Sequence, residues 1–225
     1  MSITGTEDEV AQMIVRAEAA STRPAAIEIN LSCPNISGHP PPCYDAAQMT
    51  SYMTAIAAAA KTIPVGLKLA PFLYDQQFHV VANAIRACSA IRFVIAINTI
   101  GNGLMVDVDK DVFSLSPGGP FGGLGGKAVH SLALGNVLRL RQVLPSRVDI
   151  IGCGGVDSGE AAYRFLACGA SAVEVATQLL IEGPSVFARI NRELMQIMQR
   201  KGFSSIQDIH RRWHKSAQPA LTARL

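Results

Sequence analysis

Apolar residues are concentrated in short runs that recur along the whole chain. Several runs of four to eight residues are rich in Val and Ile and lack strict polar alternation, as is typical of parallel strands buried on both faces. The runs are AIEINLS (26–32), VGLKLA (65–70), FVIAINT (93–99), VDIIGCGG (148–155) and AVEVAT (172–177), and MSIT (1–4) could end a further strand. The pattern predicts about six strands.

The segments between these runs carry helix signals. Thr6 and Glu9 have the spacing of a capping box, and Asp45 can cap the alanine-rich segment that ends near residue 61. A further helix is predicted over 158–168, with Asp157 before it and Gly169 after it, and another lies between Pro184 and Gly202. Strands therefore alternate with helices, which indicates an α/β protein.

Polar residues mark the carboxyl ends of successive predicted strands. A doubly wound sheet concentrates its ligand contacts at one or two crossover points, whereas a (β/α)8 barrel draws them from nearly every strand. The residues are Asn30, Ser32, Cys33, Lys68, Asn98, Thr99, Gly154, Gly155 and Thr177. Their distribution favours a TIM barrel, although a closed barrel needs eight strands and only about six are predicted.

Composition narrows the class of protein. The chain has 225 residues, of which 49% are hydrophobic, and a net charge of +3. This is ample material for one compact core, and no dense basic stripe suggests nucleic-acid binding. No apolar stretch reaches the roughly 18 residues of a membrane span, and the N-terminus lacks secretory-signal features. We therefore expect a cytoplasmic protein that binds neither nucleic acid nor membrane.

Neither the cysteines nor the histidines have the spacing of a metal site. The five cysteines form no C-x-x-C pair, so reduced thiols are expected. DVDKD (107–111) resembles the start of a calcium loop, but Val112 stands where the glycine belongs and Gly118 where the glutamate belongs. No metal is predicted, and the histidines are expected to be surface or satisfied residues.

Glycine-rich segments suggest phosphate binding. GCGGVDSGE (152–160) turns directly into a predicted helix, and VATQ (175–178) follows one βα unit later. Backbone N–H groups at such a turn, with a nearby hydroxyl, suit a phosphate, although the glycines could serve only a tight turn. FGGLGG (121–126) follows no strand directly and lacks the P-loop ending, so either a loop near a ligand or a plain linker is possible.

Three strand-end side chains allow more than one interpretation. Lys68, inside a buried strand, could meet an anion, form a Schiff base or extend its ammonium towards solvent. Asn30 and Asn98 could form hydrogen bonds with the donors and acceptors of a planar heterocycle, or each could cap a turn.

Six motifs together resemble the dihydroorotate dehydrogenases, specifically the soluble class 1A enzymes. They are INLSCPN (29–35), GLKLAPF (66–72), INTIGNGL (97–104), FGGLGG (121–126), IIGCGGVDSGEAA (150–162) and LLIEGPSVFARI (179–190). The resemblance runs from about residue 1 to 213 with the motif order preserved. It implies an FMN-linked (β/α)8 TIM barrel, here without the first two βα units, over residues 1–213, followed by a mobile tail at 214–225.

The resemblance also implies an activity. The family oxidises dihydroorotate to orotate in pyrimidine biosynthesis, with FMN as cofactor and, in this class, fumarate as acceptor, and the resemblance also implies a homodimer. Cys33 would be the catalytic base, and the substrate would be held by Asn30, Asn35, Asn98 and Thr99. The flavin would be held by Asn30, Lys68, Ile97, Gly126, Gly154, Gly155, Ala176 and Thr177.

The implied chemistry suits these residue types. A thiolate can remove a proton while hydride passes to the flavin, and a cationic lysine stabilises the reduced, anionic flavin. An alternative is a catalytically impaired barrel fragment that acts as an interaction protein or needs a complementing chain. A Schiff-base lyase using Lys68 is a third possibility.

Overall fold

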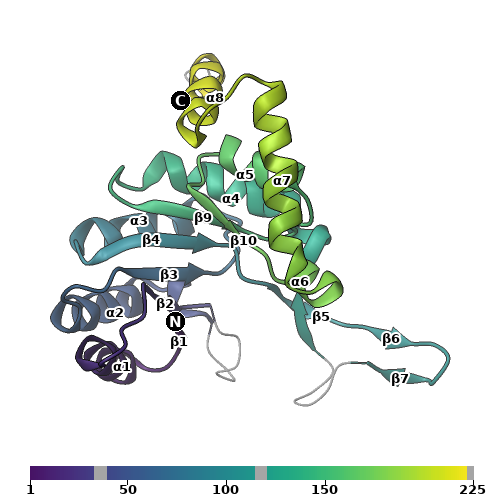
Figure 1. Ribbon diagram of the computed structural model, residues 1–225. Coiled ribbons are helices and arrows are strands. Elements are labelled where there is room, and N and C mark those ends of the chain that lie inside the picture. Colours follow the sequence, from purple (N-terminus) through teal and green to yellow (C-terminus); the bar gives the residue numbers. More distant parts are fainter. Residues whose placement is uncertain (33–39, 115–120, 222–225) are drawn as a thin grey trace.

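A computed structural model describes residues 1–32, 40–114 and 121–221, with side chains described up to residue 213. Its centre is a parallel sheet with the strand order β1-β2-β3-β4-β9-β10 (Figure 1). The strands are β1 (Ser2–Ile3), β2 (Ile27–Asn30), β3 (Val65–Leu69), β4 (Ile91–Ala96), β9 (Asp149–Cys153) and β10 (Ala172–Glu174). All six predicted strands are confirmed.

Each strand of this sheet lies beside the next one along the chain, so the sheet order never reverses. A doubly wound sheet reverses its order at a switch point, whereas a barrel winds in one direction. The observed winding confirms the predicted α/β class and is that of a TIM barrel with six described strands.

Helices connect the strands, and most of them pack along one face of the sheet, whereas α6 lies at the carboxyl ends of the strands and α8 packs on α5 (Figure 1). They are α1 (Glu7–Ala19), α2 (Ala46–Ala59), α3 (Asp75–Ala87), α4 (His130–Val143), α5 (Gly159–Ala167), α6 (Thr177–Glu182), α7 (Ser185–Arg200) and α8 (Ile206–Leu221), with short 3₁₀ turns at Pro42–Tyr44 and Gly126–Val129. Thr6 with Glu9 forms the predicted capping box, and Asp45 caps α2 by accepting a hydrogen bond from Gln48. Helix α8 crosses the predicted boundary at residue 213.

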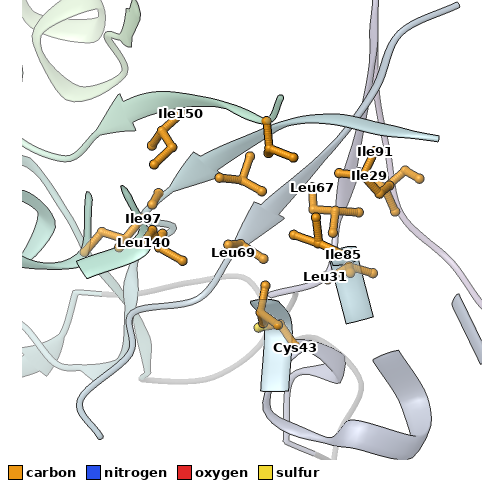
Figure 2. Close-up of a cluster of buried hydrophobic side chains, with 14 of the residues drawn as sticks. Ile29, Leu31, Cys43, Leu67, Leu69, Ile85, Ile91, Ile97, Leu140 and Ile150 are labelled. Atoms are coloured by element: carbon orange, nitrogen blue, oxygen red, sulfur yellow. The ribbon is translucent and has the colours of Figure 1, made fainter. Parts of the chain in front are cut away.

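The hydrophobic core lies between this helical layer and the sheet. Figure 2 shows the outward strand residues Ile29, Leu67 and Ile150 in one buried cluster, together with Ile85 from α3 and Leu140 from α4. These side chains are fully buried. Their burial explains why the strands stand out as apolar runs in the sequence.

The opposite face of the sheet differs from what the sequence predicted. Burial alternates along β2, because Ile27 and Ile29 face the helices while Glu28 and Asn30 are only partly buried on the inner face. Lys68 is likewise the least buried residue of β3. The prediction of strands buried on both faces was therefore wrong for these strands, since their inner face contributes polar groups to a pocket.

Two small antiparallel ribbons were not predicted. β5 (Ile100–Gly103) pairs with β8 (Gly122–Leu124), and β6 (Val106–Asp107) pairs with β7 (Val112–Phe113). FGGLGG therefore supplies a strand and is not a plain linker. The β6–β7 hairpin projects from the body of the molecule (Figure 1) and contains the calcium-like sequence in its turn.

Candidate functional site

A pocket of about 450 Å³ lies at the carboxyl ends of β3, β4, β9 and β10. This volume falls within the range of about 300 to 1,000 Å³ that is usual for small-molecule sites. Its lining includes the predicted ligand residues Lys68, Ile97, Asn98, Thr99, Gly126, Gly154, Gly155, Ala176 and Thr177. Because parallel strands present their carboxyl ends at one edge of the sheet, residues from distant segments meet in this pocket.

The two glycine-rich segments approach each other closely on one side of the pocket. Gly126, Gly154 and Gly155 have φ values of +69°, +126° and +69°, which L-residues rarely adopt. A Cβ on Gly155 would lie 2.8 Å from the carbonyl oxygen of Gly126. Glycine is therefore required here both by the backbone conformation and by the contact between the loops.

Ala176 and Thr177 complete this side of the pocket at the start of α6. Ala176 has a φ of −118°, so this position does not need the left-handed conformation that favours glycine. Thr177 lies against the other loop, because a Cβ on Gly126 would be 3.2 Å from its methyl group. The predicted phosphate-binding residues are thus brought together from three segments.

His130 supports the glycine loop from behind. Its ring is buried, and Nδ1 lies 3.0 Å from the carbonyl oxygen of Gly154. Since a carbonyl oxygen only accepts, Nδ1 must carry the hydrogen in this bond. Nε2 is buried and has no hydrogen-bond partner among the described residues. His130 was expected to be a surface or satisfied histidine, and that expectation was wrong for Nε2.

A hydrogen-bonded amide cluster forms the second part of the site. The Asn30 Oδ1 atom accepts from Ser32 N at 3.1 Å, Ser32 Oγ at 2.8 Å and Asn98 Nδ2 at 3.1 Å. Asn98 Nδ2 also donates to Ser32 Oγ, and Asn98 Oδ1 accepts from Thr99 N at 2.8 Å. Because the Asn30 oxygen is fully engaged, its amide NH₂ is the group that can donate to a ligand.

Lys68 meets an anion, which is one of the three possibilities that the sequence left open. Its Nζ lies 2.5 Å from Oε2 of Glu174 on β10, and its side chain is only 12% exposed. Burial alone lowers the pKa of Lys68, but the acidic groups of Cys153, Glu174 and Glu28 raise it, and the net shift is upwards. A Schiff-base lysine needs the opposite shift, so this environment disfavours that chemistry.

Sequence reasoning missed three charged residues of the site. Glu174 pairs with Lys68, Glu28 lies near both, and Lys127 lines the pocket beside Asp157, with 3.9 Å between Nζ and Oδ2. The two glutamates occupy alternate positions in the strand segments AIEIN and AVEVAT. Side chains of a strand alternate between its two faces, so each glutamate must point away from the apolar residues on either side of it. This alternation could have placed both glutamates on the inner face.

Two predicted site residues, Cys33 and Asn35, lie outside the described residues. The strand that precedes them is described: β2 ends at Asn30, which pairs in register with Lys68 of β3. Their roles stay predictions from the resemblance.

The described part of the chain contains no group of three or more His, Cys, Asp or Glu side chains arranged to hold a metal ion. Four cysteines in it, Cys43, Cys88, Cys153 and Cys168, are free thiols. Burial raises the pKa of Cys43 to about 12, so this thiol is inert. No helix of the described residues is both long and apolar enough to cross a bilayer.

Comparison with known proteins identifies a consistent set of relatives. Residues 1–198 match the family described as dihydroorotate dehydrogenase. The chain is 36% identical over 214 residues to dihydroorotate dehydrogenase (fumarate) of Trypanosoma cruzi, covering 94% of this chain and 68% of the relative. It is 39% identical over 208 residues to probable dihydroorotate dehydrogenase A (fumarate) of Enterococcus faecalis, covering 92% and 66%.

Solved structures agree with these relatives. Ligand-free DHODH from Eimeria tenella superposes with a TM-score of 0.72 at 25% identity, covering 90% of this chain and 59% of that one. The same enzyme in complex with ferulenol gives a TM-score of 0.71, covering 90% and 57%. The chain thus spans about two thirds of the curated relatives and somewhat less of the solved structures.

Proposed function

Since this chain belongs to the dihydroorotate dehydrogenase family, we propose that it binds FMN and oxidises dihydroorotate to orotate in cytoplasmic pyrimidine biosynthesis, with fumarate as the electron acceptor. One observation carries the proposal. Seven of the eight residues expected to hold the flavin, all except Asn30, line a single pocket of about 450 Å³ at the carboxyl ends of β3, β4, β9 and β10.

The residues of the pocket suit FMN. The phosphate fits the backbone of Gly154 and Gly155, which both have positive φ values. A Cβ on Gly154 would meet the side chain of Ala133, and a Cβ on Gly155 would meet the carbonyl oxygen of Gly126, so neither position has room for a side chain. Thr177 adds a hydroxyl to the same pocket, beside Gly126. Ile97 offers an apolar surface for the ring system. When bound, FMN supplies an acceptor for the hydride that leaves the substrate.

The amide cluster is proposed to hold the pyrimidine ring. Asn30 presents amide hydrogens, because its oxygen is engaged by Ser32 and Asn98. Thr99 lines the same pocket, and Asn35 is proposed to join them from the following loop. A preformed polar cluster orients a planar ligand at a low entropic cost.

Cys33 is proposed as the base that removes the substrate proton. A thiol with a reference pKa of about 8.5 is partly ionised near neutral pH, which suits this task. Lys68 is proposed to stabilise the negative charge of the reduced flavin, and its raised pKa keeps it protonated.

The first test is flavin uptake by the purified chain. We expect the protein with added FMN to show flavin absorbance after gel filtration and to lose that colour on anaerobic addition of dihydroorotate. Gly155→Ala should prevent uptake, because its Cβ would meet the Gly126 carbonyl oxygen at 2.8 Å. Gly135→Ala is the matched control, since a Cβ there meets nothing within 4 Å.

Failure of the purified chain to take up FMN would refute the proposal that this chain is an enzyme. A barrel fragment that acts as an interaction protein, or one that needs a complementing chain, would then be the better description.

Substitution of Cys33 tests the base. Cys33→Ala should abolish flavin reduction by dihydroorotate while FMN stays bound. Cys33→Ser should retain a small rate that rises with pH, because serine is the weaker acid. The assignment would be contradicted if Cys33→Ala lost FMN but the protein that still held FMN were reduced by dihydroorotate at the parent rate.

We further propose that the chain forms a homodimer through the β6–β7 hairpin. The hairpin projects from the body and exposes Met105 (64%), Val108 (79%) and Phe113 (61%) (Figure 1). Such an apolar surface is typical of an interface. Phe113→Arg should shift the mass measured by light scattering from that of a dimer to that of a monomer. Val15→Arg on α1 is the control and should leave the dimer intact. A parent chain that is itself monomeric would refute the proposal.

A further inference from the structure

The floor of the pocket contains an ion pair that the proposed role of Lys68 does not explain. Lys68 on β3 and Glu174 on β10 meet at 2.5 Å. A lysine placed only to attract negative charge would work better alone, because the carboxylate cancels much of its field. The pair therefore calls for a second function.

A second carboxyl group lies next to this pair. Glu28 on β2 is two residues from Asn30, which pairs in register with Lys68, so the side chains of Glu28 and Lys68 share the inner face. Ser2 Oγ on β1 donates to Glu28 Oε1 at 2.8 Å. Burial raises the pKa of Glu28, Ser2 and Lys68 lower it, Glu174 raises it, and the net shift is upwards.

In the described part of the chain, the strands beside this pair supply no second cation, and Lys127, which also lines the pocket, lies 3.9 Å from its own acidic partner Asp157. Cys153 on β9 pairs in register with Glu174, and its pKa is raised mainly by burial, so it is a neutral thiol near pH 7. On β4, Ile95 pairs with Lys68 and carries no charge. Two carboxyl groups thus share one ammonium, and the floor is neutral only when one carboxyl group holds a proton.

We propose that Lys68, Glu174 and Glu28 act as one ionisable unit, in which Glu28 takes up a proton when a group bound against Lys68 becomes negatively charged. Glu174 is the positioning residue that holds the ammonium at the pocket floor. The negative group is the reduced flavin, and this assignment rests on the proposed function. In the proposed reaction the substrate would lose a hydride to the flavin and a proton to Cys33, and one further proton from solvent would add to the Glu28 carboxylate to balance the negative charge on the flavin.

The coupling follows from linkage. If protonation of Glu28 favours the negatively charged ligand, the charged ligand must raise the proton affinity of Glu28 by the same factor. Proton uptake by Glu28 then offsets the negative charge that reduction adds to the ligand, so the summed charge of floor and ligand stays the same in both redox states, which a fixed ion pair cannot achieve.

The first experiment uses the chain without cofactor. Carboxyl ¹³C NMR of glutamate-labelled protein should show Glu28 titrating above the ordinary range of glutamate. Glu174→Gln should lower this pKa, because it removes a neighbouring negative charge. Ser2→Ala should raise it, because it removes the hydrogen bond that favours the ionised form. Glu160→Gln on α5 is the matched control and should change nothing.

The second experiment measures the midpoint potential of bound FMN against pH. For a two-electron couple, each proton taken up shifts the potential by about 30 mV per pH unit. The parent chain should therefore show a slope about 30 mV per pH unit steeper than Glu28→Gln wherever Glu28 takes up its proton on reduction. Equal slopes in the two proteins would overturn the inference.

The two proposals can fail separately. If no FMN binds, the proposed function fails, and the carboxyl titration alone decides whether the unit exists. If FMN binds but neither Glu174→Gln nor Ser2→Ala moves the Glu28 titration, the proposed function stands and the ionisable unit is refuted. Ser2→Ala also keeps the test decisive where a glutamate variant fails to fold.

Discussion

Glu18 fastens the end of α1 to the turn that follows α2. Its carboxylate accepts the backbone N–H groups of Lys61, Thr62 and Ile63 at 2.7 to 2.9 Å, and the residue is only 7% exposed. The Ile63 N–H makes the largest contribution to a lowered pKa of about 2, against an ordinary 4.5. Ionised Glu18 therefore satisfies backbone groups that would otherwise lack partners.

This carboxylate should give the fold an acid-sensitive component. Because its folded pKa lies below the unfolded value, its stabilisation is complete above about pH 4.5 and is lost as the pH falls towards 2. Glu18→Gln should lower the melting temperature at pH 7 and flatten its fall between pH 4.5 and 2. Thermal melts followed by circular dichroism would check this, with the exposed Glu160→Gln as control; parallel pH curves for Glu18→Gln and parent would contradict it.

Asn136 makes a similar polar link between α4 and the segment after β3. Its Oδ1 accepts from Phe72 N at 2.8 Å and its Nδ2 donates to Phe72 O at 3.0 Å, and the side chain is 2% exposed. Asn136→Ala should cost about 2 to 4 kcal/mol of unfolding free energy, because both backbone groups lose their partner inside the core. Urea denaturation measures this; the exposed Asn83→Ala should change little, and equal losses would refute the role.

At the scale of elements, α5 and α7 are joined through a glycine. A Cβ on Gly159 would lie 2.4 Å from the backbone nitrogen of Leu194, and its N–H donates to Glu193 at 2.7 Å. Gly159→Ala should therefore lower the unfolding free energy by about 1 to 3 kcal/mol, because it forces the helices apart. Gly135→Ala within α4 should instead stabilise by up to about 1 kcal/mol, since it removes a helix glycine without a clash. Stabilisation by both substitutions would contradict this packing.

Elements with local signals were predictable, and those without them were not. The caps of α1 and α2 depend on residues three positions apart, so Thr6 and Asp45 could be identified from the sequence. The β5–β8 ribbon pairs Ile100 with Leu124, across more than twenty residues and through glycines that have no periodic pattern. Neither strand could be recognised before both were brought together.

At the scale of the whole molecule, the pocket joins loops from strands that are distant in the chain. A ligand that contacts β3, β4, β9 and β10 together binds only the folded state. FMN at 100 times its dissociation constant should therefore stabilise the chain by about 2.7 kcal/mol and raise the melting temperature by about 5 to 10 °C. Differential scanning fluorimetry would measure the shift, which should be absent in Gly155→Ala and present in Gly135→Ala; an equal shift in both variants would place FMN elsewhere.

The order of strands, the helix caps and half of the residues that line the pocket could be determined from the sequence alone. The reason is physical: buried parallel strands need apolar runs, and their carboxyl ends must meet at one edge of the sheet. The partners of Lys68 were decided only by the tertiary structure. Glu28, Glu174 and Lys68 are far apart in the chain, and only the winding of the sheet places two carboxyl groups beside one ammonium on its inner face.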